Sequence, residues 1–132
     1  MIKAVIFDYG GVINRHLRVQ RPMLELSRQL RSRGLKTAVL SNMSTPVAWG
    51  VKRRPQMNDF DIRVFSCDIG ARKPNRQSYA AVLKQLKLKP QECLFIDNRA
   101  DNIAGAEDLG MPVVWARDTA QTLEDIEHLL KF

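Results

Sequence analysis

The chain has 132 residues, of which 45% are hydrophobic and 27% are charged, a composition typical of a globular protein, and we expect a single domain over residues 1–132. No stretch approaches the ~18 consecutive apolar residues of a membrane span, which excludes a transmembrane protein. The excess of 21 Lys and Arg over 14 Asp and Glu gives a formal net charge of +7, which favours anionic partners.

The start of the chain and its cysteines indicate the compartment. The first predicted strand begins almost at the amino terminus and leaves no room for a signal peptide, so we expect a cytoplasmic protein. Cys67 and Cys93 both fall in predicted strands and lack the spacing of metal ligands. We therefore expect both thiols to be reduced and buried.

The first predicted strand covers residues 2–7, which are apolar apart from Lys3. Such a run is typical of a strand that is buried on both faces of a parallel sheet. Asp8 ends the strand, and Gly10 and Gly11 follow, so the backbone can turn sharply and approach a ligand there. A carboxylate in this place lies where open α/β sheets bind ligands. The alternative is a tight turn that Asp8 only caps.

Strand and helix patterns alternate along the rest of the chain. After a polar stretch that reaches Gln20, a helix is expected to begin at Pro22 and to end at Gly34. We expect further strands at residues 35–40, 62–67, 93–96 and 111–115, and further helices at 45–51, 74–86, 100–109 and 119–130. Thr119 or Thr122 would cap the last helix, and residues 52–61 are expected to be irregular and exposed.

Polar residues follow the predicted strands: Asp8, then Ser41 with Asn42, then Asp97 with Asn98. Strands that alternate with helices pair in parallel, so their carboxyl ends meet at one edge of the sheet. The sequence therefore predicts an α/β fold of three layers, Rossmann-like, in which helices cover both faces of a parallel five-stranded sheet.

Basic residues are concentrated in two parts of the chain. Seven of them surround a single acidic residue, Glu25, and a second group covers residues 52–54; the seven are Arg15, Arg18, Arg21, Arg28, Arg31, Arg33 and Lys36. This surface could contact nucleic acid or attract an anionic substrate, or it could be a solvated helix face. No nucleic-acid-binding motif accompanies the charge, and aromatic residues do not alternate with it as stacking on bases requires.

Four segments of the chain resemble the four motifs of the haloacid dehalogenase-like hydrolase superfamily, in the same order. They are residues 7–12 (FDYGGV), 41–42 (SN), 72–74 (RKP) and 95–106 (FIDNRADNIAGA). The resemblance covers almost the whole chain. It is closest to the subgroup of glucose-1-phosphate phosphatase-like proteins and the amino-terminal domain of soluble epoxide hydrolases.

The resemblance implies a phosphohydrolase that acts on phosphomonoesters. Asp8 matches the nucleophile that forms an aspartyl-phosphate. Ser41 and the amide of Asn42 match the donors that hold the phosphate oxygens. Lys73 matches the cation that balances the charge between phosphate and nucleophile, and it counts as both catalytic and substrate-binding.

The resemblance also implies a Mg²⁺ cofactor. Asp8, the carbonyl of Gly10, Asp97 and Asn98 match the metal site, and Asp101 matches a supporting acidic residue. Mg²⁺ suits such a site because it binds a few protein oxygens together with waters and a substrate phosphate.

Two residues depart from the family pattern. Gly10 stands where most phosphatases of the superfamily have an aspartate that serves as general acid and base, help that is typically worth about 10²–10⁴-fold. Asn98 stands where the family usually has the aspartate that touches the metal. The loss of one negative charge predicts weaker Mg²⁺ binding and weak activity.

No cap domain is expected, because only residues 13–40 separate the first motif from the second. The site should therefore be open to a phosphorylated small molecule or to an exposed phosphate of a macromolecule. Arg15, His16 and Arg18 are expected to lie at its rim, with His16 as an ordinary loop residue.

Two other functions compete with the phosphatase. A catalytically degenerate protein of the same fold would bind a partner through its basic face, and Gly10 and Asn98 would then be marks of decay. In a metal-independent dehalogenase, Asp8 would attack a carbon atom, but Lys73 and Asp101 would have smaller roles in that reaction. Fold alone does not decide between these functions.

Overall fold

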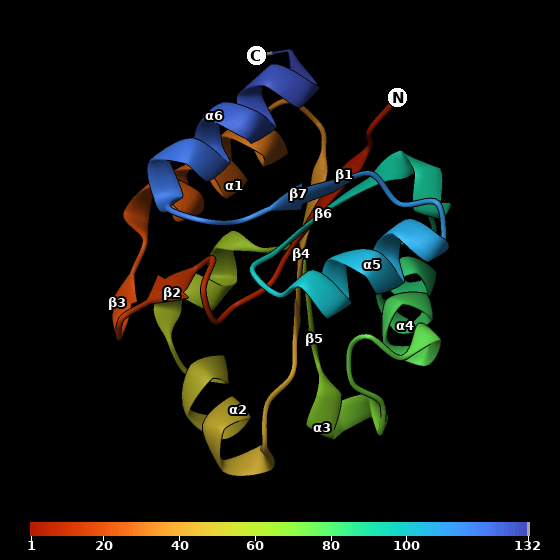
Figure 1. The fold of residues 1–132 in the computed structure, drawn as a ribbon. Helices are drawn as coiled ribbons and strands as arrows, with labels where there is room; N and C mark the ends of the chain where they lie inside the picture. The colour runs from red at the N-terminus through yellow and green to blue at the C-terminus, as the bar shows by residue number, and fades with distance from the viewer. Residues whose placement is uncertain (132) are drawn as a thin grey trace.

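The computed structural model describes residues 1–131 and has a five-stranded parallel sheet at its centre (Figure 1). The order of strands across the sheet is β5-β4-β1-β6-β7. The strands are β1 (Ala4–Phe7), β4 (Lys36–Ser41), β5 (Ile62–Phe65), β6 (Cys93–Asp97) and β7 (Val113–Trp115). Helices cover both faces, so the predicted three-layer α/β fold is confirmed.

The central strand explains why apolar runs predict this sheet. All four residues of β1 are fully buried. Val5 and Phe7 belong to the hydrophobic cluster on one face, and Ala4 and Ile6 belong to the cluster on the other. Successive side chains of a strand point to opposite faces, so a strand covered on both sides must be apolar throughout.

Two pairs of helices supply these clusters. Helices α1 (Arg21–Ser32) and α6 (Thr119–Leu130) cover one face and pack against each other, and α4 (Arg76–Leu86) and α5 (Ala100–Asp108) cover the other (Figure 1). The bounds of α6 are those that its apolar spacing predicts. Its cap is Asp118 instead of Thr119 or Thr122, because the Asp118 carboxylate accepts a hydrogen bond from the Gln121 amide at 2.8 Å.

Smaller elements follow the carboxyl ends of the strands. A hairpin of β2 (Asn14–Arg15) and β3 (Arg18–Val19) comes after β1, α2 (Thr45–Lys52) comes after β4, and α3 (Ser66–Ile69) comes after β5 (Figure 1). The 3-10 helices η1 (Pro55–Asp59) and η2 (Pro90–Glu92) precede β5 and β6. Between β1 and β4 the chain forms only the hairpin and α1, so no cap domain is inserted there.

Three local predictions were wrong. The hairpin was missed because its turn uses His16 and Leu17 at φ 52° and 62°, where Gly and Asn give the usual turn signal. Residues 52–61 are not all exposed, since Met57 and Phe60 are buried in the core. Cys67 lies in the short helix α3 and is half-buried; it and the buried Cys93 are both free thiols.

No helix within residues 1–131 combines the length and the hydrophobicity that crossing a bilayer would require.

Candidate functional site

The polar ends of three strands meet at one cavity of about 570 Å³. Asp8 follows β1, Ser41 ends β4, and Asn98 follows β6. Eleven residues line the cavity: Asp8, Gly10, Ser41, Asn42, Arg72, Lys73, Pro74, Asn98, Arg99, Asp101 and Asn102. The parallel sheet thus gathers side chains that lie far apart in the sequence.

Lys73 lies between two carboxylates at the base of this cavity. Its Nζ donates to Asp8 Oδ1 at 2.9 Å and to Asp97 Oδ2 at 2.7 Å. The side chains of Lys73 and Asp97 are 1% and 0% exposed. Charges buried this deeply are costly unless they are paired, so the cluster holds the ammonium group in one place.

Asp8 combines burial with two hydrogen-bond donors on the same oxygen, since the Tyr9 amide also donates to Oδ1 at 2.9 Å. Burial raises the pKa of Asp8 to about 6, while Lys73 opposes the rise and the nearby Asp97 charge adds to it. A carboxylate that is poorly solvated and held in one orientation suits a nucleophile.

Asn42 fixes the backbone that carries Lys73. Its side-chain amide donates to the Lys73 carbonyl at 3.0 Å, and its side-chain carbonyl accepts from the Lys73 amide at 2.8 Å. The loop between α3 and α4 is therefore tied to the end of β4 by the Asn42 side chain.

The end of the Asn98 side chain lies among acceptor oxygens. With its nitrogen turned inward, the amide donates to the Gly10 carbonyl, to Asp8 Oδ2 and to Asp97 Oδ1, each at 3.3 Å. With its oxygen turned inward, it faces acceptors only. Oxygens that converge in this way repel one another unless a donor or a cation lies among them.

This oxygen set fits a hard divalent cation such as Mg²⁺. Within residues 1–131 no group of three or more His, Cys, Asp or Glu side chains could hold a metal. The ligands would instead be mixed: the carboxylates of Asp8 and Asp97, the Gly10 carbonyl and the Asn98 amide oxygen, completed by waters and a phosphate. Asn98 suits the site with and without the cation, because its amide can turn either its oxygen toward a cation or its nitrogen toward the acceptor oxygens.

Gly11 makes room for Asn98. A Cβ at position 11 would lie 2.2 Å from the Asn98 side-chain nitrogen, and the backbone there has φ +87°, which favours glycine. The second glycine after Asp8 is thus required for contact with the residue that follows β6.

Other predicted site residues lie farther from this centre. Asp101 is at the rim of the cavity, where its Oδ1 accepts from Arg99 Nε at 3.2 Å. Arg15, His16 and Arg18, which we expected at the rim, are not among the lining residues, and Arg18 lines a different cavity.

Sequence reasoning missed four lining residues: Arg72, Pro74, Arg99 and Asn102. Asn102 is buried and donates to Asp97 Oδ2 at 3.2 Å, while its side-chain carbonyl has no partner within residues 1–131. Arg72 is exposed and lines the cavity beside Lys73. All four missed residues stand inside the family-like segments 72–74 and 95–106, so their place in those motifs was the available signal.

Comparisons with known proteins agree with this geometry. A family model described as haloacid dehalogenase-like hydrolase matches residues 4–110. Bifunctional epoxide hydrolase 2 of Rattus norvegicus is 34% identical over 116 residues, which cover 84% of this chain and 21% of that protein. A phosphatase of Mycobacterium tuberculosis is 35% identical over 108 residues, which cover 80% of this chain and 48% of that protein.

The (S)-2-haloacid dehalogenase of a Pseudomonas species is 30% identical over 100 residues, which cover 75% of this chain and 43% of that enzyme. The chain thus spans about a fifth of the epoxide hydrolase and less than half of the phosphatase and the dehalogenase.

Solved structures share the fold. An uncharacterized protein from Corynebacterium glutamicum superposes with a TM-score of 0.90 at 22% identity, over 100% of this chain and 97% of that chain. A haloacid dehalogenase family enzyme from Bacteroides thetaiotaomicron, in complex with magnesium and inorganic phosphate, has a TM-score of 0.77 at 18% identity, over 93% of this chain and 99% of that chain.

Proposed function

The chain belongs to the haloacid dehalogenase-like hydrolases, and on that basis we propose that it is a Mg²⁺-dependent phosphohydrolase with Asp8 as its nucleophile. The observation that carries this proposal is the placement of Asp8 between a buried ammonium and a converging set of oxygens, at the base of an open cavity. Relatives that are phosphatases, and a structural neighbour that binds magnesium and phosphate, support it.

Each step uses a residue of the cavity. Asp8 attacks the phosphorus of a phosphomonoester, so that a bond from its carboxylate oxygen to phosphorus forms and the bond to the leaving oxygen breaks. Water then attacks the same phosphorus, phosphate leaves, and the carboxylate is restored. Lys73 balances the charge between Asp8 and the incoming phosphate, and Ser41 and the Asn42 amide donate to the phosphate oxygens.

Mg²⁺ would be held by Asp8, the Gly10 carbonyl, Asp97 Oδ1 and Asn98. When bound, it supplies positive charge against the phosphate oxygens. Asp97 Oδ2 accepts from both Lys73 and Asn102, so this second oxygen of Asp97 orients Lys73. Asp101 supports the rim of the cavity through its ion pair with Arg99.

The substrate should carry a good leaving group, because Gly10 offers no side chain to protonate the leaving oxygen. The missing general acid would cost about 10²–10⁴-fold with a poor leaving group and far less with a phenolate. The absence of a cap leaves the cavity open to phosphorylated small molecules and to exposed phosphates of macromolecules.

Hydrolysis of an aryl phosphate by the purified protein tests the proposal. Turnover is measured as release of the phenol. We expect turnover in millimolar Mg²⁺ and its loss in EDTA. Turnover that persists in EDTA would contradict the assigned cofactor.

A dehalogenase is the second candidate, favoured by the Pseudomonas relative and by Gly10 and Asn98. Halide release from a 2-haloacid in EDTA, with no aryl phosphate turnover, would establish it instead. If neither substrate reacts, the chain would be a binding protein of the same fold.

Asn98→Asp is expected to strengthen Mg²⁺ binding and to destabilise the metal-free protein. The substitution removes an amide that can donate to three acceptors and adds a charge beside Asp8 and Asp97, so in EDTA we expect a loss of about 1–3 kcal/mol in unfolding free energy. Because ligand charge tunes the affinity for hard cations, Mg²⁺ affinity should rise about tenfold or more. Thermal unfolding with and without Mg²⁺ measures both effects without reference to activity.

Asn58→Asp is the matched control, since Asn58 is exposed and lies outside the cavity. It should change neither the stability in EDTA nor the response to Mg²⁺. An Asn98→Asp protein that responds to Mg²⁺ no more than the parent would remove Asn98 from the metal site.

Gly11→Ala should impair the site more than it impairs the fold. Gly11 and Gly34 share φ +87°, but a Cβ at position 34 meets nothing within 4 Å, whereas at position 11 it displaces Asn98. Each substitution should cost about 1 kcal/mol or more in unfolding free energy through backbone strain. Only Gly11→Ala should lower aryl phosphate turnover, by about 10–100-fold. Urea unfolding and turnover, measured on both variants, separate the effect on stability from the effect on the site. Equal losses of turnover in the two variants would contradict the role of the contact between position 11 and Asn98.

A further inference from the structure

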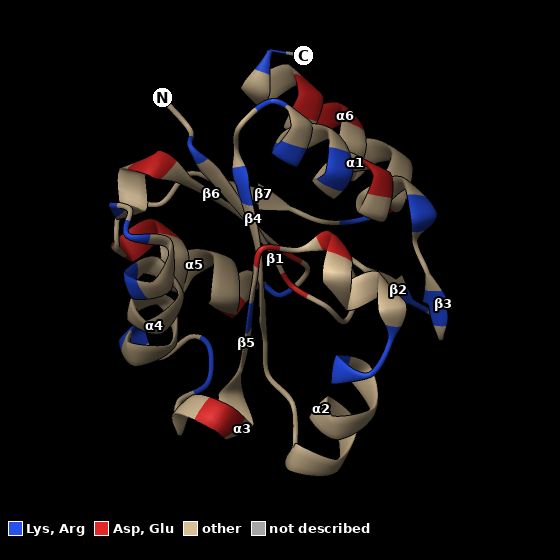
Figure 2. Ribbon diagram, turned by 180° about the vertical axis from the view of Figure 1, so that it is seen from behind, with Lys and Arg blue, Asp and Glu red and all other residues tan. Residues whose placement is uncertain are grey.

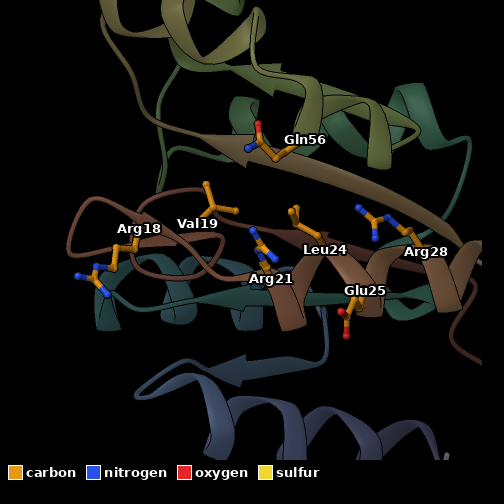
Figure 3. A pocket seen from close by; sticks show the side chains of 7 residues that line it. All are labelled: Arg18, Val19, Arg21, Leu24, Glu25, Arg28 and Gln56. Atoms are coloured by element: carbon orange, nitrogen blue, oxygen red, sulfur yellow. The ribbon is translucent and has the colours of Figure 1, made fainter.

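A second cavity, of about 540 Å³, lies between the strand β3, the helix α1 and the 3-10 helix η1 (Figure 3). No residue lines both this cavity and the one at Asp8. Arg21 and Leu24 point from α1 toward Gln56 of η1, whereas Glu25 points away from it (Figure 3). The volume is in the range of sites for small molecules, about 300–1,000 Å³.

Lys and Arg are frequent along α1 and the hairpin before it (Figure 2). Part of this charge is neutralised by ion pairs within the molecule, so the helix face is not simply solvated. Arg28 donates to both oxygens of Asp59 at 3.1 and 3.0 Å, and Arg31 lies 3.1 Å from Asp61. The charge available to a ligand is therefore concentrated at the amino end of α1 and in the hairpin.

Two arginines that line the cavity carry that charge: Arg21 lies beside Leu24 and Gln56, and Arg18 lies at one end of the cavity with its guanidinium group extending outward (Figure 3). The guanidinium groups of Arg18 and Arg21 have no hydrogen-bond or ion-pair partner among residues 1–131. Arg18 also lies directly opposite Arg15 in the antiparallel hairpin, and one guanidinium nitrogen of Arg15 is buried without a partner. Like charges opposite each other destabilise a hairpin, so an anion bound here would offset a real cost.

The other residues that line the cavity limit the kind of ligand that could bind there. Val19 and Leu24 provide apolar surface, and the side-chain oxygen of Gln56 is buried without a donor among the described residues. Guanidinium groups bind phosphate in a planar, paired geometry. We propose that this cavity is a second binding site for a small organic phosphate that also carries hydroxyl donors, separate from the site at Asp8.

An NMR titration of the ¹⁵N-labelled protein in EDTA tests this, with inorganic phosphate and glycerol 2-phosphate as probes. We expect saturable shifts of the Val19 and Leu24 amides and of the Gln56 side-chain amide, distinct from shifts of Ser41 and Asn42. The double variant Arg18→Gln/Arg21→Gln should raise the dissociation constant for the first set at least about tenfold and leave the second set unchanged.

The double variant Lys84→Gln/Lys87→Gln removes the same charge from exposed positions on and after α4 and should leave both sets of shifts unchanged. Equal weakening by the two double variants would mean general attraction to a basic protein and would overturn the site. The absence of saturable shifts at Val19, Leu24 and Gln56 would overturn it as well. Because Ser41 and Asn42 report separately, neither outcome bears on the proposed phosphohydrolase.

Discussion

Asp8→Asn is expected to lower aryl phosphate turnover at least about 10³-fold, because an amide cannot form the phosphoryl intermediate and removal of a covalent nucleophile costs this much or more. The change is nearly isosteric, and the Asn98 side chain and Lys73 keep their places around it. The variant should still unfold cooperatively. Initial rates in saturating Mg²⁺ give the comparison.

Asp108→Asn is the control for this substitution, because Asp108 ends α5, is exposed and lies outside both cavities. It should keep the turnover of the parent. If Asp8→Asn retains a tenth or more of the turnover, the nucleophile is another group and the mechanism fails.

Lys73→Met is expected to have the largest effect on stability. It leaves Asp8 and Asp97 buried without their shared cation, and removal of one partner from a buried ion pair costs about 3–5 kcal/mol. Activity should fall together with stability, since the same ammonium balances the charge of the incoming phosphate. Urea unfolding measures the change in the free energy of unfolding.

Lys52→Met shows what an exposed pair contributes. Lys52 Nζ lies 2.7 Å from Asp68 Oδ2, but the two side chains are 44% and 46% exposed, so the loss should be no more than about 1 kcal/mol. Equal stability of Lys73→Met and the parent would contradict the view that this lysine compensates two buried charges.

The sheet was predictable because its strands are buried on both faces. β1, residues 38–40 of β4 and residues 93–96 of β6 are buried apolar runs, which is the pattern of strands covered on both faces. Apolar spacing predicted α1, α4 and α6, and α6 was located to the residue, whereas α3 was not predicted. The spacing of apolar residues reflects which side chains are buried, and the buried positions of these helices and strands recur at regular intervals.

The parts that periodicity did not predict depend on contacts between distant residues. Met57 and Phe60 are buried although their neighbours are polar, because η1 folds back onto the core. The hairpin depends on two non-glycine residues at positive φ, which have no distinctive sequence signal.

The candidate site also has a part that the sequence predicts and a part that it does not. Its polar residues were predictable because each follows a strand whose end lies at one edge of the sheet. Their partners were not, because Asn42 and Lys73 lie 31 positions apart and Asp8 and Lys73 lie 65 apart. The sequence therefore indicates which residues lie at the site, and the structure adds that the Asn42 side chain bonds to the Lys73 backbone and that Asp97 accepts a hydrogen bond from Lys73.

Trapping the intermediate tests the central claim most directly. The protein would be mixed with an aryl phosphate and Mg²⁺, quenched with acid within one turnover, and digested for mass spectrometry. We predict one added phosphoryl group on the peptide that contains Asp8, labile to hydroxylamine and absent from Asp8→Asn. Turnover without any phosphorylated Asp8, or a phosphoryl group on another residue, would contradict the mechanism.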